Sequence, residues 1–181
     1  MPNLRNISLK KFLTLNSEEF ENYHSVLKWL KPVNEIKGNQ AKELGELTFG
    51  QVCYMRKGIG KPEMISKIFN MVFGMTEQET DSMKVVDFYG GFNHIIAELK
   101  KLSEAEKQLT SKPDPDWKLA GAERLNRFGE LNTLIALGER FGVEPRVIEG
   151  WPYGYVFALS LQQSIGAEVQ KEYAMIKSRP K

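Results

Sequence analysis

Apolar side chains recur every three or four residues along most of the chain, which is the pattern of helices with one buried face. Three segments also begin with the spacing of a capping box, in which two side chains three positions apart satisfy each other's backbone N–H groups. The three pairs are Asn16 with Glu19, Thr48 with Gln51, and Thr76 with Glu79. The pattern predicts an all-α fold of about seven helices in a compact bundle, with a long final helix.

The N-terminal part of the chain is predicted to hold two helices followed by a loop. The first is short and turns Leu9, Phe12 and Leu13 inward. The second is expected to end before Pro32, because a residue before proline avoids the α region. Residues 33–47 are polar and contain glycine, which predicts a loop with at most one helical turn.

Two further helices are predicted next. Residues 47–57 could form a strand or a helix, and the capping signal at Thr48 favours the helix. The following helix is expected to begin at Pro62 and end at Gly74, since proline suits the first helical position and glycine the position after the last. Its predicted inward face is formed by Ile65, Ile68, Met71 and Val72.

A longer helix is predicted from Thr76 to about Leu109, and it contains the pair Gly90 and Gly91. Two glycines inside a helix cost about 1 kcal/mol each relative to alanine. The pair therefore indicates either the close approach of a neighbouring helix or a kink.

The run SKPDPD at residues 111–116 is the clearest boundary in the chain, because two prolines and two aspartates make a stiff polar connector. It divides an N-terminal helical domain, residues 1–110, from a C-terminal helical region, residues 117–181. The first C-terminal helix is expected to stop at Gly142. Its predicted inward residues are Leu125, Phe128, Leu131 (or Asn132), Ile135 and Leu137.

Two more helices are predicted to begin at Pro145 and Pro152. The final helix is much more apolar in its first half than in its second half. We therefore expect the first half to be buried and the second half to project.

Composition narrows the class of protein. Hydrophobic residues make up 41% and charged residues 27% of the chain, which is typical of a globular protein. The net charge of +2, from 25 basic and 23 acidic side chains, argues against a nucleic-acid binder. Cys53 is the single cysteine, which fits a reducing compartment. No apolar run is long enough to span a membrane, and no signal peptide is evident, so we expect a soluble protein without membrane contact.

Signals for catalysis and metal binding are weak. His24 and His94 each lack a cysteine, histidine or carboxylate at metal-ligand spacing, and ordinary helical histidines explain both. A nucleophilic Cys53 would need a nearby base, whereas a lone cysteine with an apolar neighbour on each side is more often a small buried residue. We expect no enzyme activity, no catalytic residues, no metal and no cofactor.

Two clusters are candidate binding sites. Arg56, Lys57 and Lys61 surround glycines whose N–H groups could approach an anion, but the spacing is not that of a phosphate-binding loop and a plain basic turn is the simpler explanation. The second cluster is aromatic and suits a partner-binding surface, although such clusters also occur in cores. Its members are Trp151, Tyr153, Tyr155 and Phe157.

Two C-terminal motifs, Gly142-Val143-Glu144-Pro145 and Trp151-Pro152-Tyr153, precede a hydrophobic helix with a polar end. Together with SLKKFLTLNSEEFENY and LTFGQV nearer the N-terminus, they resemble small proteins of tailed bacteriophages, especially tail assembly chaperones. The resemblance implies an all-α, non-catalytic protein that binds other phage proteins. A chaperone of this kind is expected to grip the tape measure protein and recruit tail tube subunits.

The leading hypothesis is a non-enzymatic phage protein that acts in tail or virion assembly through contacts with phage structural or tail proteins, with homo-oligomerisation as a further option. Its expected location is the host cytoplasm or, after incorporation, the virion. The alternatives are a structural component of the virion itself, an enzyme that uses Cys53 or handles phosphate at Lys61, and a small nucleic-acid-associated protein. The last would use the basic turn and the tail residues Lys171, Lys177, Arg179 and Lys181.

Overall fold

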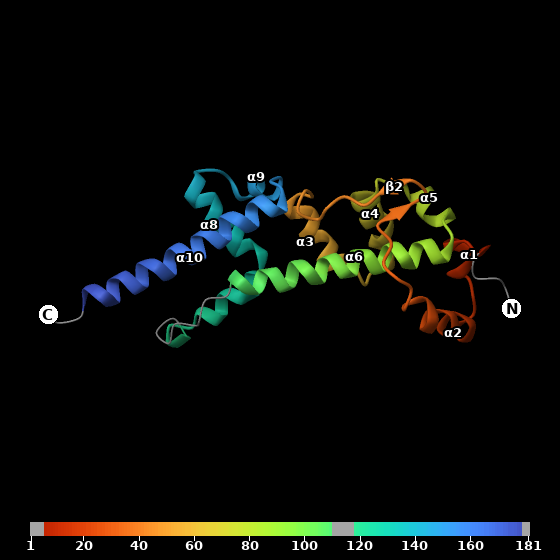
Figure 1. Ribbon diagram of the computed structural model, residues 1–181, viewed down its shortest axis with the longest axis horizontal. Helices are drawn as coiled ribbons and strands as arrows, with labels where there is room; N and C mark the ends of the chain where they lie inside the picture. Colours follow the sequence, from red (N-terminus) through yellow and green to blue (C-terminus); the bar gives the residue numbers. More distant parts are fainter. Residues whose placement is uncertain (1–5, 110–117, 179–181) are drawn as a thin grey trace. The chain divides into compact units, whose positions relative to one another are not determined.

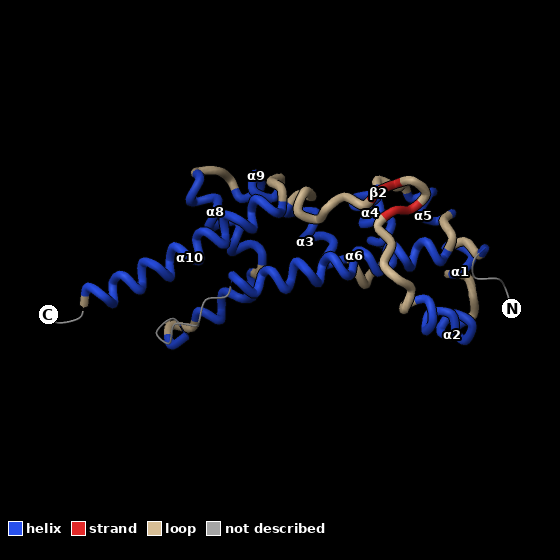
Figure 2. The backbone as a smooth tube through the Cα atoms, in the orientation of Figure 1, coloured by secondary structure: helices blue, strands red, loops and turns tan. Residues whose placement is uncertain are grey.

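The computed structural model describes residues 6–109 and 118–178, and almost all of its regular structure is helical (Figure 1). The all-α prediction is confirmed. Figure 2 shows one short antiparallel strand pair within the described residues. The elements in chain order are α1 (Leu9–Phe12), α2 (Ser17–Leu27), β1 (Glu35–Ile36), β2 (Asn39–Gln40), α3 (Phe49–Gly58), α4 (Pro62–Phe73), α5 (Glu77–Ser82), α6 (Val85–Glu106), the 3-10 helices η2 (Lys107–Leu109) and η3 (Ala122–Phe128), α8 (Glu130–Phe141), α9 (Pro145–Glu149) and α10 (Tyr153–Lys177).

The chain folds into two compact units. The first comprises Met1–Leu47 and Tyr54–Lys101, and the second comprises Thr48–Cys53 and Leu102–Lys181. Two of the three boundaries between the units therefore fall inside helices, in α3 and α6, and the third lies just before α3. The linker predicted at residues 111–116 lies outside the described residues, so the division into residues 1–110 and 117–181 stays a prediction.

Capping signals in the sequence correctly locate several helix starts. At α5, the backbone N–H of Glu79 donates to the Thr76 hydroxyl, and the Glu79 carboxylate accepts from the Thr76 N–H at 2.8 Å. The same reciprocal pair joins Thr48 and Gln51, at 2.9 and 3.2 Å. Residues 49–58 are thus the helix that the capping box favoured and not the strand alternative.

The helix predicted from Thr76 to Leu109 is wrong in one respect, because it is divided into α5 and α6. Residues 83–84 between them pair with residues 7–9 of the N-terminal segment. The Leu9 N–H donates to the Met83 carbonyl at 2.8 Å, and the Val85 N–H donates to the Ile7 carbonyl at 2.9 Å. A long-range partner thus satisfies backbone groups that a continuous helix would have paired locally.

Residues 33–47, predicted as a loop, contain the hairpin of β1 and β2. Lys37 and Gly38 connect the two strands, and both have positive φ, at 50° and 83°. Positive φ at both central positions gives the turn type whose twist matches paired antiparallel strands. The sequence signal was weak, because lysine is an unusual residue at the first of these positions.

Gly90 and Gly91 lie within a continuous α6, where they permit close approach of other segments of the first unit. The Val33 N–H donates to the Gly90 carbonyl at 3.0 Å. A Cβ atom at Gly91 would come within 2.5 Å of Ile36 Cδ1 and 3.2 Å of the Phe69 ring. The close-approach interpretation therefore fits, and the approaching residues come from the hairpin region as well as from α4.

Side chains on α4 contribute much of the buried core of the first unit. The buried face of α4 includes Ile68 and Val72, which were predicted, and Phe69 and Phe73, which were not. Leu13 was expected to point inward, but it is 60% exposed because α1 has already ended. Hydrophobic spacing located the helices here better than it located their faces.

The first C-terminal helix of the prediction is divided at Gly129, whose φ of 50° and ψ of −125° are unfavourable for other residues. The preceding η3 has about three residues per turn, so its faces do not follow the α-helical spacing. The predicted inward set is mostly wrong: Leu137 is buried and the alternative Asn132 is half-buried, whereas the other four are between 41% and 47% exposed. The exposed members are Leu125, Phe128, Leu131 and Ile135.

The chain reverses between α8 and α9 by crossing closely over Gly138. Helix α8 ends at Gly142, which has a φ of 65°. The Val143 N–H donates to the Gly138 carbonyl at 3.0 Å, and a Cβ at Gly138 would lie 2.9 Å from the Val143 oxygen. As predicted, α9 then begins at Pro145 and α10 directly after Pro152.

Gly138→Ala is expected to destabilise the second unit by about 1–3 kcal/mol, because the added methyl group would overlap a backbone oxygen. The matched control is Gly166→Ala in α10, where nothing lies within 4 Å of an added Cβ. This control should stabilise the unit by about 0.5–1 kcal/mol, since alanine favours the helix. Urea denaturation followed by circular dichroism measures both effects. Equal effects of the two substitutions would contradict the close crossing at Gly138.

Candidate partner-binding surface

The start of α10 is fixed to two other segments of the second unit. The Phe49 N–H donates to the Trp151 carbonyl at 2.8 Å. The Tyr153 ring stacks on the Phe49 ring with centroids 6.0 Å apart, and the Tyr153 hydroxyl donates to the Glu106 carboxylate. Tyr153 is only 2% exposed, so its role in the fold is to anchor the helix.

Phe141, Trp151 and Tyr155 form a partly exposed cluster, which we name the aromatic patch. The Phe141 and Trp151 centroids lie 5.4 Å apart in an edge-to-face arrangement, and the Trp151 and Tyr155 centroids lie 5.5 Å apart. Phe141 is 41% and Tyr155 51% exposed, while Trp151 is half-buried. The Arg140 guanidinium lies 5.4 Å from the Phe141 centroid. Exposed aromatic rings beside an arginine have the chemistry that is common in protein-binding hot spots.

The structure divides the four aromatic residues of the predicted cluster. Trp151 and Tyr155 belong to the aromatic patch, Tyr153 is buried, and Phe157 is half-buried. Residues two positions apart on a helix differ in direction by about 200°, which explains the different environments of Tyr153 and Tyr155. Phe141 was missed, because the chain reversal after α8 places it beside Trp151 and no local pattern signals that contact.

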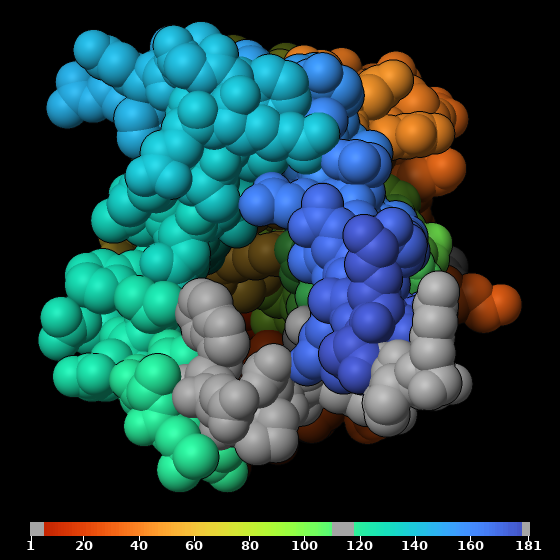
Figure 3. All heavy atoms as spheres, turned by 90° about the vertical axis from the view of Figure 1, so that its left-hand side faces the viewer, coloured from red at the N-terminus to blue at the C-terminus, as the bar shows by residue number. Residues whose placement is uncertain are grey.

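The second half of α10 carries exposed apolar side chains. Every residue of 167–178 is exposed, as predicted for a projecting half, and the blue atoms of α10 face the viewer in Figure 3. Ile165, Val169, Tyr173 and Ile176 are between 52% and 62% exposed. Their spacing of four, four and three residues places them within an arc of about 80°, and we name them the apolar stripe. The spacing is visible in the sequence, but the sequence analysis did not single it out.

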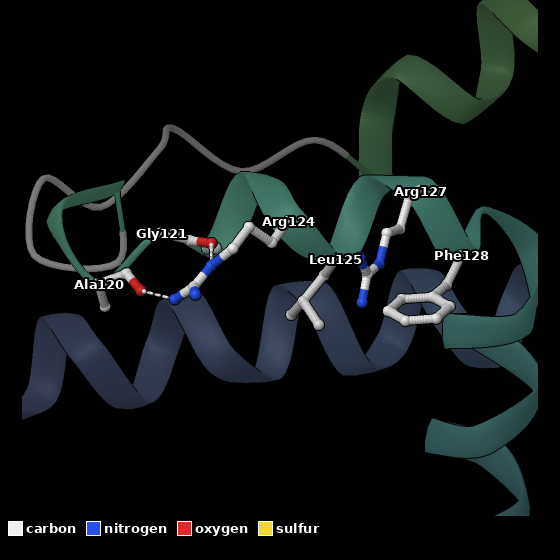
Figure 4. Close-up of a pocket in the computed structure, with 7 residues that line it drawn as sticks. Ala120, Gly121, Arg124, Leu125, Arg127 and Phe128 are labelled. Atoms are coloured by element: carbon white, nitrogen blue, oxygen red, sulfur yellow. Dashed lines mark hydrogen bonds between the residues drawn. The ribbon is translucent and has the colours of Figure 1, made fainter.

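An open depression of about 550 Å³ lies along η3, between Ala120 and Phe128 (Figure 4). Leu125 and Phe128 give it apolar lining. Arg124 donates to two nearby backbone carbonyls at 3.1 and 3.2 Å, and the Arg127 guanidinium lies 4.7 Å from the Phe128 centroid. The residues described around the depression include no carboxylate, histidine or cysteine, so they provide no acid–base pair there.

Arg56, Lys57 and Lys61 lie on both sides of the turn between α3 and α4. Arg56 and Lys57 are in the last turn of α3, where backbone carbonyls favour cations over anions. Lys61 precedes Pro62, which has no N–H to offer an anion, and the Lys61 N–H already donates to the Gly58 carbonyl at 2.8 Å. This geometry favours the basic-turn interpretation, and anion binding stays a prediction.

His24 from α2 and Tyr89 from α6 form a pair in the first unit. His24 Nδ1 lies 2.6 Å from the Tyr89 hydroxyl oxygen, and the imidazole stacks on the Phe20 ring with centroids 5.8 Å apart. Burial, assisted by the negative charge of Glu21, raises the pKa of Tyr89 to about 12. The Tyr89 hydroxyl therefore stays protonated at neutral pH and can donate to His24 Nδ1. This arrangement gives both groups a structural use.

His94 and Cys53 lie in half-buried and buried positions of the described residues, respectively. Burial beside Phe73 lowers the pKa of His94; Glu98 acts in the opposite direction and Lys101 in the same direction. His94 is therefore neutral at pH 7. Cys53 is 8% exposed, which matches the small buried residue that its neighbours indicated. Within residues 6–109 and 118–178, no group of three or more histidine, cysteine, aspartate or glutamate residues could hold a metal ion.

Helices of the described segments are all too short or too polar to cross a lipid bilayer. Comparison of the chain with protein-family models, with curated proteins and with solved structures finds no match.

Tyr89→Phe is expected to destabilise the protein at pH 7 by about 1 kcal/mol, because His24 Nδ1 loses its partner. The pKa of Tyr89 is about 12 when folded and 10.0 without the fold, so the neutral phenol favours the folded state. That contribution is present below pH 10 and is lost as the pH rises from about 10 to about 12. Urea denaturation across this range should show a smaller loss of stability in the variant than in the wild type.

The control for this prediction is Tyr155→Phe, which removes a hydroxyl from an exposed tyrosine. It should leave the stability at pH 7 unchanged, because this hydroxyl is exposed to water. If the Tyr89→Phe variant is as stable as the wild type at pH 7, the hydrogen bond between His24 and Tyr89 does not stabilise the fold.

Proposed function

We propose that the protein is a non-enzymatic assembly protein of a tailed bacteriophage, which works by binding other phage proteins through the aromatic patch. The observation that carries the proposal is the patch itself, in which the Trp151 ring contacts both the Phe141 and the Tyr155 rings, and these two are about half exposed. Rings of this kind bring large contact area and lose little conformational entropy when a partner covers them.

The aromatic patch is held in place without a partner. Trp151 is bonded through its backbone to Phe49, and Tyr155 follows in the first turn of α10. A surface that is fixed in advance avoids part of the cost of ordering side chains on binding. Arg140, beside Phe141, adds a guanidinium that can pair with an acidic group on the partner.

The sequence resemblance to tail assembly chaperones supports the class of partner. The two motifs that carry the likeness also flank the aromatic patch: Gly142-Val143-Glu144-Pro145 follows Phe141 directly, and Trp151-Pro152-Tyr153 contributes Trp151. The partners proposed on this basis are the tape measure protein and the tail tube subunits. A permanent place in the virion is the alternative form of the same proposal.

The environments of the reactive side chains support the non-enzymatic part of the proposal. His24 pairs with Tyr89, His94 is held neutral by burial, and Cys53 is buried. Each side chain thus has a structural explanation that needs no reaction.

Tyr155→Ala is expected to weaken binding to the tail tube or tape measure protein encoded in the same genome by at least about tenfold, because an exposed ring of the aromatic patch is lost. The matched control is Tyr173→Ala, which makes the same change at another exposed tyrosine of α10. It should leave this affinity within about twofold of the wild type. Calorimetric titration of the full chain at a concentration that keeps it monomeric measures both.

No binding of the wild type to either tail protein would overturn the proposed function, and equal losses in the two variants would overturn the role of the patch. The chaperone and the structural alternative are separated by protein analysis of purified virions. A chaperone is absent from them, and a structural component is present in a fixed number of copies.

A further inference from the structure

The apolar stripe is an apolar helix face that α10 leaves exposed in the second unit. Its four residues, Ile165, Val169, Tyr173 and Ile176, are each more than half exposed. We propose that this half of α10 pairs in parallel with the same half of a second copy of the chain, as a short two-stranded coiled coil. The pairing uses neither the aromatic patch nor its partners, so it stands independently of the proposed function.

The spacing of residues in this part of α10 fits the seven-residue repeat of a coiled coil, in which positions a and d face the partner helix. With Tyr173 at position a, Val169 and Ile176 both fall at position d, and Ile165 falls at the flanking position g. The a positions are Leu159, Gly166 and Tyr173, and the d positions are Gln162, Val169 and Ile176. The apolar contact is thus concentrated between residues 165 and 176, toward the end of the helix.

The charges beside the stripe are complementary to those of a second copy. With this assignment, Glu172 occupies position g of one repeat, and Lys177 occupies position e of the next repeat along the chain. In a parallel pair these two positions lie side by side across the interface, so Glu172 of each chain meets Lys177 of the other. The Lys177 ammonium already lies 5.1 Å from the Tyr173 centroid, which places it at the edge of the stripe.

The charges also favour the parallel orientation over the antiparallel one. In an antiparallel pair, g positions face g positions and e positions face e positions. Glu172 would then meet another g residue, and Lys177 another e residue, so the two opposite charges would not be neighbours. The stripe therefore pairs with a second copy of the same chain in the parallel direction.

The projecting half of α10 is prepared for pairing because the start of the helix is anchored. Tyr153 and Val156 are buried in the second unit and fix the first turns. Helix propagation from an existing turn is far easier than nucleation, so the later turns need not be formed by the partner. The contact is nevertheless short, and we expect a weak dimer whose population depends on concentration.

Sedimentation equilibrium of the full chain tests the pairing. The wild type should form dimers as its concentration rises from about 10 to about 500 µM. Val169→Glu should weaken the dimer at least about tenfold, because it buries a charge at position d. Gln170→Glu adds the same charge at the adjacent exposed residue outside the a and d seam and should have a much smaller effect. A wild type that stays monomeric throughout, or equal effects of the two variants, would overturn the proposal.

Charge reversal tests the register. Glu172→Lys and Lys177→Glu should each weaken the dimer by about threefold or more, since each places like charges side by side. The double variant with both reversals should return to within about twofold of the wild type. If the double variant dimerises no more tightly than the single variants, the proposed pairing of Glu172 with Lys177 is contradicted.

The parallel direction is tested by disulfide formation. In a parallel pair, equivalent d residues face each other, so Ile176→Cys should form a disulfide-linked dimer under mild oxidation. Ala174→Cys, on the outer side of the helix, is the matched control and should form little. Equal cross-linking of the two variants, or none in Ile176→Cys, would contradict the parallel pair.

Discussion

The second unit depends on a backbone contact between two segments that are far apart in the sequence. Phe49 donates to the Trp151 carbonyl, and Thr48 pairs with Pro152 beside it. Tyr153 reinforces this contact by stacking on Phe49 and by bonding to Glu106 at the end of α6. Three regions of the chain therefore meet at the start of α10. Their meeting fixes Trp151 and Tyr155 in the aromatic patch and gives the projecting half of α10 a rigid origin.

Close approaches at glycine set the remaining geometry. Gly138 lets the chain reverse after α8, which brings Phe141 beside Trp151. In the first unit, the absence of a side chain at Gly91 lets Ile36 and the α4 side chains Phe69 and Phe73 approach α6 closely. In both places a side chain would keep the segments apart, so these glycines determine which faces of the helices are covered. The surface that we assign to binding is thus a consequence of how the backbone packs, and not of a local sequence motif.

Local signals predicted the positions of helices well, because a capping box or a proline acts within a few residues. The starts at Thr48, Thr76, Pro145 and Pro152 show this. Long-range contacts could not be predicted in the same way. The break between α5 and α6 arises from pairing with residues 7–9, and the aromatic patch includes Phe141 only because α8 returns toward α10. The apolar stripe is different, since its spacing is visible in the sequence and only its exposure required the structure.

We expect the anchoring of Tyr153 to make the projecting half of α10 helical before any partner binds. Amide hydrogen exchange of the dilute full chain, compared with Tyr153→Phe, tests it most directly. We predict strong protection of residues 154–160 and weaker but clear protection of residues 161–178, with both reduced in the variant while α4 is unchanged. Exchange of residues 161–178 at the rate of an unfolded peptide in the wild type would contradict it.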